Sequence, residues 1–189
     1  MPAIVHEFTW PDRLVVGTVG RPGSRSFFLQ VRDRAQVLTV ALEKQQSALL
    51  AEKIDEVLDE LRATEGNPFS IPDATPVELV DNDPLEQPID PRFRTGAMSL
   101  GWDPSTAQVV IEAYAMVEED DEGDEDDVDL DSDEEDEPTE VLLVQIPVGA
   151  ARAFAKRTLE VVGAGRPLCA LCGTPIGPEG HVCPLPGDL

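Results

Sequence analysis

The chain has 189 residues, of which 41% are apolar, enough for one domain with its own core and a small appendage. Its formal net charge of -24 is concentrated, because 17 of the 38 acidic residues lie between Glu118 and Glu140 with no Lys or Arg among them. No apolar run approaches the roughly 18 to 20 residues that span a bilayer, and the N-terminus lacks the features of a secretory signal, so we expect a soluble, cytoplasmic protein.

The first part of the chain has the pattern of four short strands followed by a helix. Apolar alternation and turn residues predict strands at 4–10, 14–19, 27–31 and 36–42, of which the last two form a hairpin. From about residue 45 the apolar spacing becomes helical and predicts an amphipathic helix with one face for a sheet to cover. The apolar positions of that face are Leu50, Ile54, Val57, Leu58 and Leu61.

A proline-rich connector leads to the second part. Residues 64–92 contain six prolines, which remove backbone donors, so we expect an extended segment that packs on the surface. Beyond it, residues 97–102 and 107–116 predict a second hairpin around a DPST turn. Residues 141–146 then predict a strand, and residues 148–162 predict a second helix with an apolar face.

The two strand-to-helix passages align without a gap at an offset of 104 residues. The identical positions are Val37, Leu38, Val40, Ala51, Glu56 and Val57, which match Val141, Leu142, Val144, Ala155, Glu160 and Val161. These matches suggest a duplicated β-β-α unit, although short apolar segments also match by chance. Our hypothesis is an α+β fold in which two β-meander-plus-helix halves form one domain at residues 1–163.

All three cysteines of the chain lie in one short segment near the C-terminus, CALCGTPIGPEGHVC. The spacing C-x2-C-x8-H-x-C supplies four ligands of the type that zinc prefers, and the glycines and prolines between them favour turns. We predict that Cys169, Cys172, His181 and Cys183 bind one zinc ion, so that residues 164–189 form a small zinc knuckle. Four protein ligands leave no open coordination position, which indicates a structural site.

Two alternatives stay open for this segment. The CxxC pair could be free thiols beside an incidental histidine, or it could be a redox motif, although redox pairs usually begin a helix and this one follows Pro167. His181 is the unusual ligand, because H-x-C is less common than C-x-x-C as the second half of a zinc site. His6 is the other histidine of the chain, and it could replace His181 if the N-terminal strand runs nearby.

The acidic run at 118–140 has dense like charge and hardly any large apolar residues, so we expect a disordered loop between two strands. It could be a plain solvated spacer or a docking arm for a basic partner. Asp127, Asp129, Asp131 and Asp133 alternate as in a calcium loop, but Ser132 stands where a glycine is needed and Pro138 where a glutamate is needed. The run is therefore not an EF-hand.

A role in nucleic-acid binding would require a continuous basic stripe that joins Arg152, Arg157 and Arg166. The acidic run would repel phosphate, and we expect Arg152, Lys156, Arg157 and Arg166 on the solvent face of the second helix instead. We therefore expect no nucleic-acid partner. The sequence gives no reason to expect a membrane partner either.

An enzymatic role would require a polar cleft around His6, Glu7 and Arg32. Outside the metal cluster His6 is the only histidine, and the sequence has no GxSxG motif. No spacing distinguishes a catalytic pair of carboxylates. We therefore assign no catalytic residue and no cofactor-binding residue. The four metal ligands are the site residues that we predict.

Four stretches together resemble an uncharacterised actinobacterial domain-of-unknown-function family. They are HEFTWPDRLVVGTVGRPGSRSFFLQVRD, VALEKQQ, FRTGAMSLGWD and GRPLCALCGTPIGPEGHVCP. The resemblance implies a soluble bacterial protein with a C-terminal CxxC…HxC element, and it supports the ligand role of Cys169, Cys172, His181 and Cys183. It implies no reaction. Relatives tend to continue into a polar, basic tail after the final CP, whereas this chain ends at Leu185–Leu189, so a contact made by that tail is in doubt here.

Together these observations predict a non-enzymatic, cytosolic, zinc-binding interaction or adaptor protein that contacts a protein partner, which could be basic. The first alternative is an enzyme, or an enzyme subunit, of unknown reaction. The second alternative is a nucleic-acid-associated factor.

Overall fold

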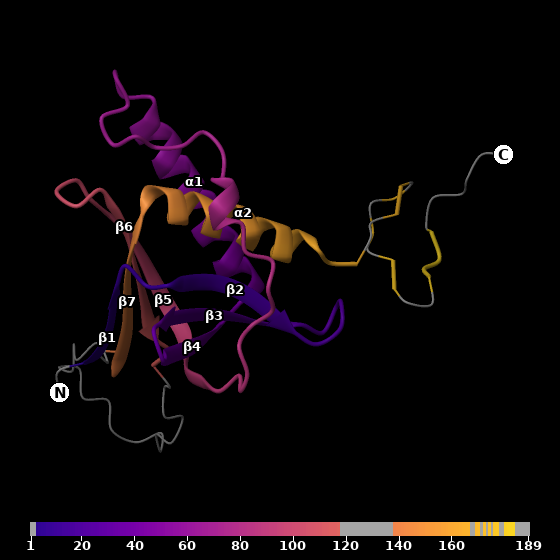
Figure 1. The fold of residues 1–189 in the computed structure, drawn as a ribbon. Coiled ribbons are helices and arrows are strands. Elements are labelled where there is room, and N and C mark those ends of the chain that lie inside the picture. Colours follow the sequence, from indigo (N-terminus) through magenta and orange to yellow (C-terminus); the bar gives the residue numbers. More distant parts are fainter. Residues whose placement is uncertain are drawn as a thin grey trace, which may run out of the picture.

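The computed structural model describes residues 3–117 and 138–166, and in the tail residues 169, 170, 172, 174, 176, 177 and 180–183. Figure 1 shows the elements in place. In chain order they are β1 (Ile4–Thr9), β2 (Arg13–Val19), β3 (Ser26–Asp33), β4 (Gln36–Leu42), α1 (Lys44–Arg62), the short 3-10 helix η1 (Val77–Leu79), β5 (Pro91–Asp103), β6 (Gln108–Ala115), β7 (Glu140–Pro147) and α2 (Val148–Gly163).

The strands form one mixed sheet in the order β1-β7-β6-β5-β4-β3-β2. Strands β2, β3 and β4 are an antiparallel meander followed by α1, and β5, β6 and β7 are a second meander followed by α2. The two meanders join where β4 and β5 pair in parallel, and β1 pairs in parallel with β7. This confirms the predicted α+β fold with two β-meander-plus-helix halves.

Strands β1 and β2 lie at opposite edges of the sheet, although residues 10–12 alone connect them. Three residues bridge about 14 Å at most, because each extended residue spans up to ~3.6 Å. A flat sheet of seven strands spaced ~4.8 Å apart would hold its edges about 29 Å apart. The sheet must therefore curl until its two edges approach each other at this corner, where Trp10 adopts a positive φ of 56°.

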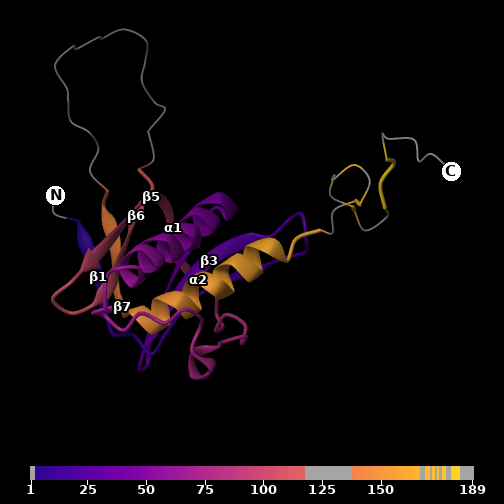
Figure 2. The ribbon, with the colours of Figure 1, turned by 90° about the horizontal axis from the view of Figure 1, so that it is seen from above.

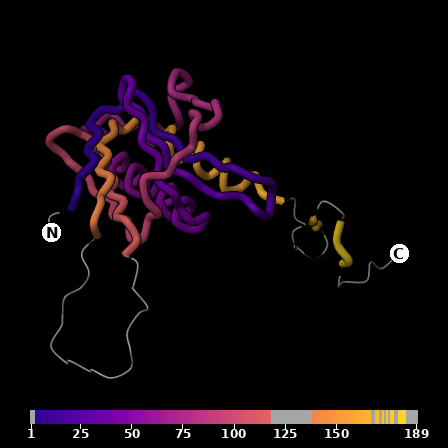
Figure 3. Tube along the Cα trace, turned by 90° about the horizontal axis from the view of Figure 1, so that it is seen from below, coloured from indigo at the N-terminus to yellow at the C-terminus, as the bar shows by residue number. Residues whose placement is uncertain are grey.

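Both helices cover the same face of the curled sheet. They lie side by side in front of the strands in Figure 2, whereas the strands lie in front of the helices in Figure 3. Inward-facing residues of both meanders and both helices form one core, with Leu29, Val40, Ile54, Ile111, Leu142 and Phe154 among its largest side chains. In the described part of the chain, neither helix combines the length and apolarity needed to cross a membrane.

Two of the pairs that align at the 104-residue offset are equally buried, whereas Val37 is 41% exposed and its partner Val141 is 8% exposed. Val40 on β4 and Val144 on β7 are both fully buried, and so are Ala51 on α1 and Ala155 on α2. These residues place the two strand-to-helix passages in corresponding environments. The duplication itself stays a hypothesis.

The connector between α1 and β5 packs against the domain as expected, and it holds the short helix η1. Leu85 and Ile71 are buried, and the amide of Gln30 exchanges hydrogen bonds with the backbone of Glu86 at 3.1 and 2.8 Å. Strand β5 begins at Pro91, six residues before the predicted start, since Thr39 and Ala41 of β4 pair with Pro91 and Arg94. A proline is tolerated at the first residue of a strand, where its missing N–H costs least.

The prediction that four basic side chains lie on the solvent face of α2 is wrong for three of them. Arg166 lies beyond the end of the helix at Gly163. Arg152 is 6% exposed and forms ion pairs with Asp55 and Asp59 of α1, both at 2.8 Å. Arg157 binds Asp81 of the connector at 2.6 Å. Helix α2 lies between α1 and the connector, so two of its polar positions face neighbouring segments.

Candidate metal centre

The first half of the C-terminal cluster is a tight loop that ends at Thr174. The backbone N–H of Cys169 donates to the carbonyl oxygen of Thr174 at 2.9 Å, which closes the loop around Cys172. The Thr174 hydroxyl lies 2.5 Å from Cys172 Sγ. Cys169 and Cys172 therefore come from one closed turn, and neither begins a helix of the described chain.

A glycine turn forms the second half. The N–H of Gly180 donates to the carbonyl oxygen of Gly177 at 3.0 Å, and the two glycines form an isolated antiparallel bridge. Gly180 has a φ of +86°, a conformation that glycine adopts without steric cost. Because the chain reverses here, His181 and Cys183 return toward the first loop.

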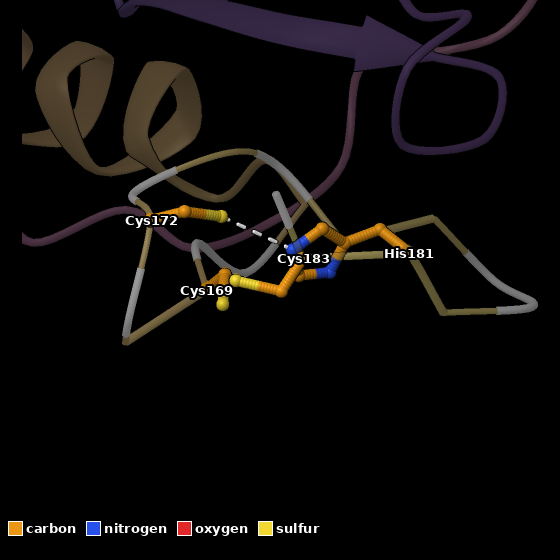
Figure 4. Close-up of side chains that lie close together, drawn as sticks. All are labelled: Cys169, Cys172, His181 and Cys183. Atoms are coloured by element: carbon orange, nitrogen blue, oxygen red, sulfur yellow. Dashed lines mark hydrogen bonds between the residues drawn. The ribbon is translucent and has the colours of Figure 1, made fainter. Parts of the chain in front are cut away.

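The ligand atoms of Cys169, Cys172, His181 and Cys183 all lie within 4.8 Å of one another. Figure 4 shows the four side chains gathered at one point, with His181 Nε2 3.2 Å from Cys172 Sγ. A zinc ion bound tetrahedrally by three sulfurs and one nitrogen would hold its ligand atoms about 3.5 to 3.8 Å apart. All four residues are partly buried, so the geometry and the donor set fit a metal ion.

The Cys172 thiol has a lowered pKa. Hydrogen bonds with the side chain and then the backbone of Thr174 lower it from 9.0 to about 6, and His181 and Cys183 contribute in the same direction. The thiolate is the form of cysteine that binds a metal. The first loop therefore favours the thiolate form of Cys172, which a metal site requires. No disulfide joins the three cysteines.

His6 does not take the place of His181. It lies on β1, and its Nε2 is 2.7 Å from Oε2 of Glu140 on the neighbouring strand β7. Arg92 donates to the same carboxylate oxygen at 2.7 Å, and the Arg92 and His6 hydrogen bonds hold the pKa of Glu140 below its ordinary value. Sequence reasoning missed this arrangement, because the parallel pairing of β1 with β7 joins residues 134 positions apart.

The cleft proposed for the enzyme alternative does not form around its three residues. His6 lines a cleft of about 520 Å³ together with Thr39, Glu86 and Arg92, but neither Glu7 nor Arg32 lines it. Successive side chains of a strand point to opposite faces, so Glu7 points away from His6. Arg32 instead forms an ion pair with Glu86 at 3.3 Å.

The prediction of a disordered loop at 118–140 falls mostly on residues outside the described ranges, since 118–137 are not described. The rest of the run is ordered. Glu140 is the first residue of β7, where it holds the hydrogen bonds to His6 and Arg92.

The chain belongs to the family described as "Protein of unknown function (DUF3090)", whose model matches residues 6–183. The match spans both meanders, both helices and the Cys/His cluster up to its last ligand. It confirms the resemblance to an uncharacterised family. No curated protein and no solved structure matches the chain.

Proposed function

We propose that this protein is a non-enzymatic, zinc-binding interaction protein whose C-terminal segment folds around one structural zinc ion. The observation that carries this proposal is the convergence of Cys169, Cys172, His181 and Cys183 within 4.8 Å from two separate turns. Three thiolates and one imidazole suit zinc better than the hard cations calcium and magnesium, which prefer oxygen ligands.

The role of the ion in this proposal is to fold the tail, residues 164–189, as a unit separate from the domain at 1–163. The tail offers few apolar side chains for a core, and a structural zinc ion contributes on the order of 10 kcal/mol to the folding of such a segment. A site with four protein ligands has no position for a substrate or an activated water. The proposed ion therefore has no catalytic role.

A protein contact is the use we propose for this tail. Val182 lies between two of the ligands, and it is 95% exposed. This exposed apolar side chain beside two proposed ligands is available for contact with a partner. We further propose that the acidic run attracts a partner with a basic surface, and that the protein acts in the bacterial cytoplasm.

Neither alternative gains a specific observation in its favour. Arg152 is bound to Asp55 and Asp59, so it does not join Arg157 and Arg166 in a basic stripe on the surface. The residues named for an enzyme, His6, Glu7 and Arg32, do not share a cleft. The proposal accordingly assigns no reaction.

Affinity capture from the native host tests the interaction role. The full chain is compared with Val182→Asp and with a chain that lacks residues 118–137, a deletion that spares Glu140 and its hydrogen bonds. We expect Val182→Asp to lose a specific partner while it keeps its metal. If both variants retain every partner of the wild type, neither surface makes the contact and the interaction role is wrong.

A further inference from the structure

The basic side chains without a carboxylate partner gather at one end of the molecule. Within the described residues, which include every Lys and Arg, five of these side chains have no such partner. They are Arg21, Arg25, Arg34, Lys44 and Arg166, whereas the other basic side chains form ion pairs. Four of the five lie where the β2–β3 turn, the start of α1 and the end of α2 meet, and Arg34 lies in the β3–β4 turn.

A cleft of about 730 Å³ opens at this end of the molecule. Arg25, Lys44 and Arg166 line it together with Arg94. Glu43 is the one carboxylate among the described residues of its lining. This side chain is already engaged, because it caps the first turn of α1 and pairs with Arg94. The cleft is therefore strongly cationic in a chain whose net charge is -24.

Arg25 is held in place before any ligand arrives. Its Nη1 donates to the carbonyl oxygen of Val161 at 3.1 Å, and its guanidinium lies 5.3 Å from the ring centroid of Phe27. Arg166 lies against the β2–β3 turn, since a side chain placed at Gly23 would meet its Nε at 3.1 Å. Two cations thus come together from segments far apart in the sequence, with Lys44 on the helix beside them.

The walls between these charges are apolar. Phe27 and Leu42 face each other across the β3–β4 pair, and Val162 of α2 adds partly exposed surface to the lining. A cleft of this volume is in the range of about 300 to 1,000 Å³ that holds small ligands. The lining therefore selects for a molecule with a multiply charged anionic group and an apolar body.

A second cleft, which is lined by two arginines, differs in charge. Arg13 and Arg157 line it, but both bind the carboxylate of Asp81 at 2.6 Å. Their charge is therefore neutralised within the chain. In the cleft at the start of α1, by contrast, Arg25, Lys44 and Arg166 form no ion pair and are available to bind an anionic ligand.

We propose that this cleft binds a small organic phosphate, with the phosphate group between Arg25, Lys44 and Arg166 and the apolar body against Leu42 and Val162. A phosphate monoester concentrates a charge of about -1.5 to -2 and three acceptor oxygens on one group. Guanidinium groups match that geometry with paired N–H donors. The inference is independent of the zinc proposal, because none of the four metal ligands lines the cleft.

The test is a titration of phenyl phosphate into the full-length protein, followed by calorimetry and by backbone amide NMR. We expect saturable binding, with shifts centred on residues 23–28, 41–44 and 162–166. The double variant Lys44→Gln/Arg166→Gln should lose affinity by about tenfold or more, because charge-assisted hydrogen bonds to the anion are removed. The free energy of unfolding of the double variant should equal that of the wild type, since neither side chain has an ion pair in the described structure.

Arg34→Gln is the matched control, because the Arg34 side chain also forms no ion pair but lies in the β3–β4 turn, outside the cleft, and its backbone N–H, which the substitution keeps, donates to Asp12. The proposal fails if phenyl phosphate does not saturate at millimolar concentration, or if Arg34→Gln weakens binding as much as the double variant. Equal affinity for tricarballylate would overturn the choice of phosphate. If phenyl phosphate binds only after residues 118–137 are deleted, the acidic segment is the occupant of the cleft, and the phosphate proposal is overturned.

Discussion

Arg152 on α2 donates from Nη1 to Oδ1 of Asp55 on α1 at 2.8 Å, in the seam between the two helices. Its second guanidinium nitrogen donates to Asp59 at 2.8 Å, and its Nε donates to the carbonyl oxygen of Pro72 at 3.3 Å. One side chain therefore ties α2 to α1 and to the connector. This is the contact through which the helices of the two halves are joined by charge as well as by apolar packing.

Arg152→Gln should lower the free energy of unfolding by about 2 kcal/mol, because it leaves two carboxylates without their cation in a partly buried seam. The control is Lys156→Gln, which removes an exposed i,i+4 pair with Glu160 and should cost less than about 0.5 kcal/mol. Urea unfolding of the three proteins measures the difference. Equal midpoints for the two variants would show that Arg152 does not hold the helices together.

The acid sensitivity of the domain should depend on Asp81. The hydrogen bond from Arg13 lowers its pKa from 3.8 to about 2. Because the folded-state pKa lies below the unfolded value, this stabilisation is present above about pH 4 and is lost as the pH falls from about 4 to about 2. Between about pH 4 and about pH 2, the free energy of unfolding should fall by about 2 kcal/mol more in the wild type than in Asp81→Asn.

Urea midpoints at pH 5, 4, 3 and 2 measure this difference. Asp83→Asn is the control, since its neighbour Arg13 contacts the carbonyl oxygen of Asp83 rather than its side chain. Parallel pH curves for the wild type and Asp81→Asn would contradict the assignment.

Gly17→Ala should destabilise the domain by about 1 to 3 kcal/mol through overpacking. A β-carbon at Gly17 would lie 2.5 Å from Cγ of Leu85, so the connector would have to move away from β2. Gly163→Ala at the end of α2 meets no atom within 4 Å and should be neutral or slightly stabilising. Thermal unfolding compares the two variants. If Gly17→Ala lowers the stability of the Leu85→Ala protein as much as that of the wild type, the contact with Leu85 is not the cause and this packing is contradicted.

The sequence was sufficient to predict the elements because their signals are local. Alternation and turn residues located the strands, and the helical spacing from Leu50 to Leu61 located α1. The early start of β5 was missed because Pro91 and its neighbours belong to a proline-rich segment, and the pairing with β4 that orders them is not a local property. The curl of the sheet was missed for the same reason.

The proximity of the three cysteines and His181 was also predictable, because cysteine and histidine at close spacing are informative without tertiary structure. The other polar sites were not. Arg152 and Arg157 were expected on the solvent face of the second helix. Their roles, like that of Arg25, depend on which distant segment lies opposite. The cationic cleft depends on basic side chains that form no ion pair in the described structure, and a sequence pattern does not show which side chains these are.

Cys172→Ser should release the metal and unfold the tail while the domain keeps its cooperative transition. The reason is that the tail depends on the ion, whereas the core consists of residues from both meanders and both helices. Limited proteolysis should cut the variant after about residue 166 and leave a resistant domain. Thr174→Val, which keeps all four ligands, should retain the metal, and global unfolding of Cys172→Ser would show that the tail is not independent.

The most direct measurement is the metal content of the natively purified chain, by intact mass spectrometry under native conditions together with elemental analysis. The account predicts one zinc ion per chain, retained in Thr174→Val and lost in Cys172→Ser. A wild-type protein purified under reducing conditions that carries no metal, and that does not take up zinc when it is supplied, would contradict it.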